Sequence, residues 1–440
     1  MPAVDLITMG CSKNLVDSEH LLFRLKEAGY NVYHNPHKLH HDVAIVNTCG
    51  FINDAKAESI EMILKLVDLK SSKKLRKVLV MGCLSERFYK ELNQEIPGVD
   101  KYYGKFNWNA LVDDLVAEDK ITRPHYFGYT ATEGRLLTSS NHYAYIKISE
   151  GCDRHCAYCA IPLMTGRHKS RPIEDILHEM EGMAKKGVHE FQIIAQELTY
   201  YGLDLYKKRN IAELVERMAA VKGVRWIRLH YAYPNDFPLD LLPVMRNNPN
   251  VCRYLDIALQ HASDRILERM QRHITAEEQR SLIKTIRKEV PGIAIRTTFM
   301  VGFPGETEED FEELLAFVKE MRFERMGAFT YSEEEGTAAA RLYEDDVPEE
   351  VKQKRLDKLM DVQQEISQEI MATRVGQVMP VVVSHKEGGY YVGRTEFDSP
   401  EVDGVVFISV PKGKRLLNGH VYNVDITDSN EFDLYGKLQQ

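Results

Sequence analysis

Three cysteines crowd into one short loop in the middle of the chain. Cys152, Cys156 and Cys159, here called the central thiols, follow the apolar stretch 143–148, with three residues between the first pair and two between the second. Four-iron clusters are held by cysteine thiolates, normally four of them. A loop with only three leaves one iron able to bind another ligand. The sequence therefore predicts an iron-sulfur site with an open position at which chemistry can occur.

A structural zinc site is the main alternative for this loop. Structural zinc closes with four Cys or His ligands at characteristic spacings. The nearby candidate for a fourth ligand is His155, which lies between two of the thiols in a tight turn. This position does not favour a closed tetrahedral site, so we prefer the iron-sulfur interpretation.

Three further cysteines each follow a short apolar segment. Strands that alternate with helices form a parallel sheet, and ligand sites in such sheets lie beyond the carboxyl ends of the strands. We therefore expect Cys11, Cys49 and Cys83, here called the N-terminal thiols, to meet at one sheet edge. The alternative is chance placement, because cysteine is among the most buried residue types. The apolar segments are 5–9, 43–46 and 78–81.

Both sets of cysteines resemble those of a known enzyme superfamily. The central spacing, with Tyr158 just before the last thiol, resembles the radical S-adenosylmethionine (SAM) enzymes. Those enzymes bind SAM at the open iron and cleave it reductively to a 5'-deoxyadenosyl radical. A second three-cysteine set, with the strings 10–19, 47–51 and 82–84, resembles the methylthiotransferases. Within that family the chain is similar to the branch that modifies an aspartate of a ribosomal protein, from about residue 4 to residue 435.

Length and composition agree with an enzyme of several domains. The chain has 440 residues and a net charge of -9, without a dominant block of Lys and Arg. No apolar stretch approaches membrane-spanning length, and the first residues lack the features of a signal peptide. We expect a cytoplasmic protein without membrane contact. Its seven cysteines should stay reduced there, which favours metal binding over disulfides.

The hydrophobic pattern changes twice, which predicts three domains of an α/β protein. Residues 1–125 alternate strands with helices and would form a parallel α/β methylthiotransferase domain that carries an auxiliary cluster. After a polar linker at 130–141, residues 138–372 would form a partial TIM-type (β/α)6 radical SAM barrel. Residues 374–440 show short alternating strands, which predicts an all-β barrel that resembles a TRAM domain. The expected strands are 143–148, 190–195, 225–230, 254–259, 293–300 and 326–331 in the central domain, and 378–384, 390–395, 404–409 and 420–427 in the last.

Residues at strand ends are candidates for the SAM pocket. Gly302 and Gly305 permit tight backbone turns whose amides could contact a cofactor, and an ordinary strand-to-helix turn is the equal alternative. Gln196 and Glu197 end the second barrel strand, where the superfamily commonly places polar groups that hold the amino end of SAM.

Two further side chains are weighed for cofactor binding and two for packing. Arg296 could pair with the SAM carboxylate through its planar guanidinium, or satisfy a structural carboxylate. Tyr158 is expected to contact adenine, with packing as the alternative. Cys252 has no partner thiol at a ligand spacing, which predicts a structural, half-buried role. His261 is interpreted as a hydrogen-bonded core residue.

The resemblance implies two four-iron clusters and a defined product. The central cluster would pass an electron to SAM, which starts hydrogen removal from an unactivated carbon. The cluster on the N-terminal thiols would carry the sulfur, which one SAM methylates while a second starts the radical step. A reductant protein such as flavodoxin or ferredoxin would supply electrons. The product would be a methylthio group on the β carbon of an aspartate in small-subunit ribosomal protein number twelve.

Charge bears on the choice of substrate, because a sister branch modifies adenosines in transfer RNA. Residues 374–440 contain seven Lys and Arg against nine Asp and Glu, a net of -2. An RNA-binding module should present a basic surface, so we expect no stable nucleic-acid binding. Asp398, Glu401 and Asp403 would instead dock the ribosomal protein, which is basic in its family. The alternatives are a transfer RNA adenosine methylthiotransferase and a non-catalytic iron-sulfur assembly protein.

Overall fold

The computed structural model describes residues 2–40, 42–120 and 134–439. The chain begins with a five-stranded parallel sheet in the order β2-β1-β3-β4-β5. Every residue of β3 and β4 is buried, because apolar clusters pack on both faces of the sheet. The elements are β1 (Ala3–Thr8), α1 (Ser12–Glu27), β2 (Asn31–His34), β3 (Val43–Thr48), α2 (Asn53–Ser71), β4 (Lys77–Gly82), α3 (Cys83–Arg87), α4 (Tyr89–Glu95), β5 (Lys101–Tyr102) and α5 (Trp108–Glu118).

A six-stranded parallel sheet forms the central domain, in the order β13-β12-β11-β10-β9-β6. All six predicted strands are present within three residues of the predicted bounds, so the partial barrel is confirmed. The strands are β6 (Tyr143–Lys147), β9 (Glu190–Ile194), β10 (Trp226–Ala232), β11 (Val251–Ile257), β12 (Ala294–Val301) and β13 (Arg325–Thr330), with a small hairpin of β7 (Ser149–Glu150) and β8 (Lys169–Ser170). The helices are α6 (Ile161–Thr165), α7 (Ile173–Lys185), η1 (Leu198–Tyr200), α8 (Ile211–Ala219), α9 (Leu241–Asn247), α10 (Asp264–Arg269), α11 (Ala276–Glu289), α12 (Glu308–Met321) and α13 (Ala338–Leu342).

A long helix, α14 (Glu349–Ala372), leads into a closed barrel with the order β14-β15-β16-β18-β17. The four predicted strands of this domain are all present, and the predicted α/β class with a C-terminal β barrel is confirmed. A fifth strand, β18, closes the barrel and was not predicted. The strands are β14 (Val378–Glu387), β15 (Tyr390–Arg394), β16 (Val406–Ser409), β17 (Val421–Ser429) and β18 (Leu434–Leu438).

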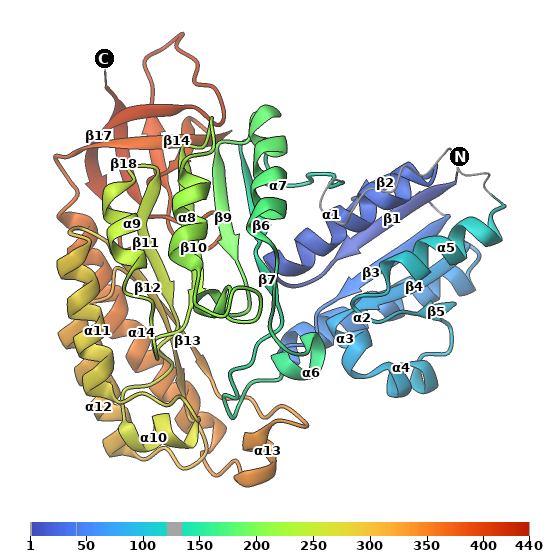
Figure 1. The fold of residues 1–440 in the computed structure, drawn as a ribbon, viewed down its shortest axis with the longest axis horizontal. Coiled ribbons are helices and arrows are strands. Elements are labelled where there is room, and N and C mark those ends of the chain that lie inside the picture. Colours follow the sequence, from blue (N-terminus) through green and yellow to red (C-terminus); the bar gives the residue numbers. More distant parts are fainter. Residues whose placement is uncertain (1, 41, 121–133, 440) are drawn as a thin grey trace.

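Figure 1 shows the C-terminal barrel across one end of the central sheet and the N-terminal sheet beside it. The C-terminal barrel contacts the first residues of central strands: Arg394 bonds to Glu190 of β9, and Asp398 pairs with Arg325 of β13. It therefore covers the amino ends of these strands. The carboxyl ends, where the predicted active mouth lies, face the other way. In the predicted linker, residues 134–141 form no helix or strand, and residues 130–133 lie outside the described part.

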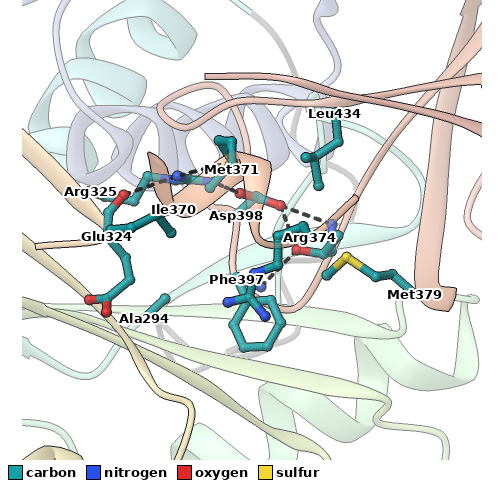
Figure 2. Close-up of a pocket in the computed structure, with 11 residues that line it drawn as sticks. Ala294, Glu324, Arg325, Ile370, Met371, Arg374, Met379, Phe397, Asp398 and Leu434 are labelled. Atoms are coloured by element: carbon teal, nitrogen blue, oxygen red, sulfur yellow. Dashed lines mark hydrogen bonds and ion pairs between the residues drawn. The ribbon is translucent and has the colours of Figure 1, made fainter. Parts of the chain in front are cut away.

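This arrangement corrects the predicted docking surface. Asp398 is 3% exposed and pairs with Arg325, as Figure 2 shows, while Asp403 accepts a hydrogen bond from Tyr254 at 2.8 Å. Both carboxylates lie in the contact between the last two domains and cannot meet a partner protein. Glu401 is exposed, although it accepts a 2.6 Å hydrogen bond from a tyrosine of β6. The acidic run is mainly a contact inside the protein.

The same contact bears on the two roles predicted for Arg296. Its guanidinium lies 3.6 Å from the Asp256 carboxylate and 3.5 Å from that of Asp403. Arg296 therefore lies against structural carboxylates, one of them from the C-terminal barrel, which supports the structural alternative. None of the described helices is long and apolar enough to cross a membrane.

Two facing cysteine sites as a candidate active site

The N-terminal thiols come from three neighbouring strand ends. Cys11 lies just beyond β1, Cys49 follows β3, and Cys83 begins α3 directly after β4. β1, β3 and β4 are adjacent and parallel, so their carboxyl ends lie along one edge of the sheet. The Cys83 thiol is close enough to the other two for their charges to affect its pKa. The structure thus brings the three thiols together at the predicted edge.

Tight backbone packing keeps this edge compact. Gly10 has φ +85°, and a Cβ there would lie 2.8 Å from the Cys49 Sγ. Gly82 has φ +106°, and a Cβ would lie 2.5 Å from oxygens of β3. Only glycine accepts this φ without strain, so both turns require it. The side chain of Asn14 accepts a 3.6 Å hydrogen bond from Cys83 and fixes that thiol.

Two arginines and a tyrosine surround the central thiols. Arg272 donates to the Cys156 Sγ at 3.3 Å, and the hydroxyl of Tyr233 lies 3.7 Å from the same sulfur. The backbone amide of Arg154 donates to the Cys152 Sγ at 3.4 Å. The Arg154 and Arg272 guanidiniums lie 4.0 and 3.9 Å from the Tyr233 ring centroid. Donors and cations beside the sulfurs stabilise negative charge and tune the potential of a bound cluster.

Burial keeps several of these thiols protonated when no metal is bound. It raises the pKa of Cys83 and of Cys152 to about 12, and it also raises the pKa of Cys49 and Cys159. A metal must displace these protons to bind. All seven cysteines are free thiols in the structure.

Each thiol set supplies donors of the kind that hold four-iron clusters. Among residues 2–40, 42–120 and 134–439, no three His, Cys, Asp or Glu side chains converge around one metal ion. Structural zinc needs such convergence. In a four-iron cluster each cysteine binds a different iron, so the thiols surround a larger group than a single ion. Each set therefore offers three donors suited to a cluster.

A buried charge network connects the two sets. Lys105 of the N-terminal domain lies 2.6 Å from Glu150 and 3.7 Å from Asp17. Lys147 of β6 pairs with the same two carboxylates. Burial alone would raise the pKa of Glu150, but the two ammonium groups hold it down at about 2. In addition, α3 packs against α6, which starts just after Cys159. These contacts hold together the elements that carry the two thiol sets.

Gln196 and Glu197 lie at the end of β9, as predicted, but they already have partners. Gln196 donates to Glu150. Glu197 accepts hydrogen bonds from the Thr199 amide at 2.6 Å and from Arg154 at 3.3 Å. Glu197 therefore fixes the loop of the central thiols. The Oε1 atom of Gln196 is buried without a hydrogen-bond partner in the described part of the chain, so a contact with SAM remains a proposal for this residue.

The two candidate glycines have a structural explanation. The Gly302 amide donates to Glu306 at 2.8 Å, and the Gly305 amide donates to Asp346 at 2.6 Å. A Cβ on Gly302 would lie 2.2 Å from the side chain of Lys352. These amides are occupied within the protein, so the ordinary strand-to-helix turn is the interpretation that the structure supports.

The remaining candidates divide between the site and the core. Tyr158 lies in the central loop, and its hydroxyl accepts a 3.4 Å hydrogen bond from Arg272, so adenine contact stays a prediction. His261 is fully buried and accepts from the Ser263 amide at 3.0 Å, which confirms a core role. Cys252 is 1% exposed in an apolar cluster, more buried than predicted but structural in role.

Three protein-family models match successive parts of the chain. Residues 146–318 match the radical SAM superfamily, residues 3–104 match uncharacterized protein family UPF0004, and residues 375–438 match the TRAM domain. Among solved structures, the radical SAM methyltransferase TsrM from Kitasatospora setae has a TM-score of 0.53 at 15% identity, over 75% of each chain. The cobalamin-dependent SAM radical enzyme OxsB has a TM-score of 0.51 at 14% identity, over 83% of this chain and 56% of its own. At such identity the likeness shows the fold alone. Fold and cysteine sites together define a radical SAM enzyme.

Relatives that match over their full length identify the family within the radical SAM enzymes. The chain is 59% identical to the ribosomal protein uS12 methylthiotransferase RimO of Bacteroides fragilis, over 99% of both chains. It is 58% identical to the protein of the same name in Bacteroides thetaiotaomicron, over 99% of this chain and 98% of the relative. For Flavobacterium johnsoniae the identity is 51%, over 99% and 97%. The chain belongs to the RimO family of methylthiotransferases.

Proposed function

We propose that this enzyme adds a methylthio group to the β carbon of an aspartate in ribosomal protein uS12. The observation that carries the proposal is the pair of three-thiol sets on facing elements, fixed against each other by the Lys105 network. One set can serve radical formation and the other can hold the sulfur. The enzyme therefore has a site for each of the two steps of a methylthio transfer. Relatives named for this activity match the chain over nearly its full length.

We infer two four-iron clusters, with SAM at the one on the central thiols. Bound there, the cluster and SAM would supply the radical chemistry that removes hydrogen from a carbon without useful acidity. Arg272 and Arg154 would stabilise the negative charge of the thiolates. The buried Lys105, Lys147, Asp17 and Glu150 network would keep the distance between the two sets constant.

The protein substrate is favoured over transfer RNA by the names of the relatives. The net charge of the last domain gives weaker support than the sequence suggested, because Asp398 and Asp403 are neutralised inside the protein. Glu401 stays exposed and is the remaining candidate of the three for docking the ribosomal protein. We further propose a cytoplasmic location and a flavodoxin or ferredoxin as electron donor.

The direct test is mass spectrometry of uS12 from cells with and without this enzyme. An added methylthio group on one Asp, present only with the enzyme, is the expected result. Unmodified uS12 together with methylthiolated transfer RNA would replace the proposal by the RNA-modifying alternative.

Iron content tests the number of clusters. Anaerobically reconstituted enzyme should hold about eight irons, and alanine at all three central thiols should remove about half and abolish SAM cleavage. Alanine at all three N-terminal thiols should also remove about half of the iron, but should leave SAM cleavage intact. Cys252→Ala is the matched control, because this thiol is buried outside both sets and should not change the iron content. Full iron in the N-terminal triple variant would contradict the second cluster.

A further inference from the structure

One cation beside the two thiol sets has no anionic partner. Lys13 lies in the first turn of α1, two residues after Cys11. Its Nζ lies 3.2 Å from the ring centroid of Tyr231. Within residues 2–40, 42–120 and 134–439 it makes no other contact of hydrogen-bond or ion-pair range. A lysine is also disfavoured here, because the amino end of a helix is itself positive. An anion from outside the chain would give Lys13 a partner and would offset the positive charge at this end of the helix.

The neighbouring cations already have partners. Lys105 and Lys147 share Asp17 and Glu150, as described above. Arg154 pairs with Glu197, Arg296 pairs with Asp256, and Arg272 donates to the Cys156 sulfur. The charge of Lys13 is felt by Asp256, but that carboxylate lies beyond ion-pair distance and is paired with Arg296. Lys13 is thus the cation of this group that remains able to accept an anion.

Lys13 connects the elements that carry the two thiol sets. On one side the chain continues to Cys11. On the other side Tyr231 lies near the carboxyl end of β10, two residues before Tyr233, whose hydroxyl touches the Cys156 sulfur. Tyr231 has φ +65°, an uncommon conformation for a bulky residue that is characteristic of functional sites. This conformation holds the ring under the ammonium group, with cation-π attraction fixing Lys13 in place.

We propose that Lys13 binds the carboxylate of the substrate aspartate. The inference rests on the proposed function, in which the β carbon must be reached from both thiol sets and therefore lies between them. The carboxylate is bonded directly to that carbon. An ammonium group on the contact between α1 and β10 would bind the carboxylate and leave the neighbouring β carbon open to both sets. Lys13 is then a specificity-determining residue that distinguishes aspartate from an uncharged side chain.

The test compares two substrates within each enzyme preparation. Once mass spectrometry has located the modified residue, binding of uS12 is measured anaerobically against uS12 in which that Asp is replaced by Asn. The wild-type enzyme should prefer Asp by ~10-fold or more, as expected for a hydrogen bond to a charged group. Lys13→Met and Lys13→Gln should bring the ratio close to one, and Lys13→Arg should restore most of it. Because the ratio is taken within one preparation, a reduced folded fraction does not alter it.

Lys26→Met is the matched control, since it removes an exposed lysine from the same helix and should keep the wild-type ratio. A wild-type ratio near one, or a Lys13→Met variant that still prefers Asp, would overturn the inference. The methionine carboxylate of SAM is the competing anion. If Lys13→Met weakened SAM binding while keeping the Asp preference, Lys13 would serve SAM and the inference would be wrong. Failure of the proposed function is distinguishable, because uS12 would then carry no modification at all.

Discussion

Removing Glu190 is expected to loosen the joint between the radical SAM and TRAM domains. Glu190 starts β9, is 2% exposed, and accepts two hydrogen bonds from Arg394 of the TRAM barrel at 2.8 and 2.9 Å. Arg228 of β10 donates to the same carboxylate and also to the carbonyl of Thr395. The two arginines hold the pKa of Glu190 far below its usual range, against the effect of burial. One carboxylate therefore neutralises two buried cations.

The expected loss of stability follows from the two buried arginines that Glu190→Ala leaves without a partner. Arg228 and Arg394 would be buried without a counter-charge, and breaking a buried ion pair from one side costs about 3–5 kcal/mol. For a folding unit of 150–250 residues, each kcal/mol lowers the melting temperature by about 2–4 °C. The expected loss is therefore ~6–20 °C. Glu190→Gln keeps an acceptor oxygen but not the charge, so its loss should be smaller.

Differential scanning calorimetry of the reconstituted enzyme measures this loss. Glu181→Ala is the matched control, because this glutamate lies exposed on α7 and its removal should change the melting temperature little. The double variant Glu190→Ala/Arg394→Ala should lose less than the two single variants added together, since it removes one of the unpaired cations. A melting temperature for Glu190→Ala within 2 °C of the wild type would refute the reasoning.

Three further predictions concern the cluster sites and pH. Gly82→Ala should cost about half of the iron, because its Cβ would collide with β3 and shift the neighbouring Cys83, and iron analysis checks this. Arg272→Gln should make the reduction potential of the central cluster more negative, measured by a redox titration followed by electron paramagnetic resonance, since a cation beside Cys156 is lost. Burial lowers the pKa of His20 from 6.5 to about 3, so only the unfolded chain takes up its proton between these values. His20 should then contribute about 1.4 kcal/mol per pH unit to the loss of stability of the metal-free protein below pH 6.5, and His20→Gln should reduce the slope in urea unfolding by that amount.

The sequence predicts most of the fold because its strands are buried and apolar. All six strands of the radical SAM barrel and four of the TRAM barrel were expected close to where they lie. The short strands β2 and β5 were missed because a two-residue or half-exposed strand has no clear period. β18 was missed for a related reason, since its glycine interrupts the pattern at Gly436.

The sequence predicted the candidate site only where the functional residues stand at a recognisable spacing along the chain. The cysteines follow strand ends, so topology alone brings them together. Arg272 and Tyr233 escaped notice because each is isolated in sequence and reaches the central thiols only through the fold. Asp398 and Asp403 were wrongly predicted to be exposed, because they lie in an acidic stretch of the sequence. Their partners, Arg325 and Arg296, are far away in sequence and only the folded chain brings them near.

The ion pairs beneath the TRAM barrel limit how this enzyme can be rebuilt. A TRAM barrel transplanted from an RNA-modifying relative would bury Glu190 and Arg325 unless it brought equivalents of Arg394 and Asp398. Chimeras that exchange the last domain alone should therefore fold poorly, whatever substrate the donor recognises. A working chimera requires these charged positions to be exchanged as matched sets across the joint.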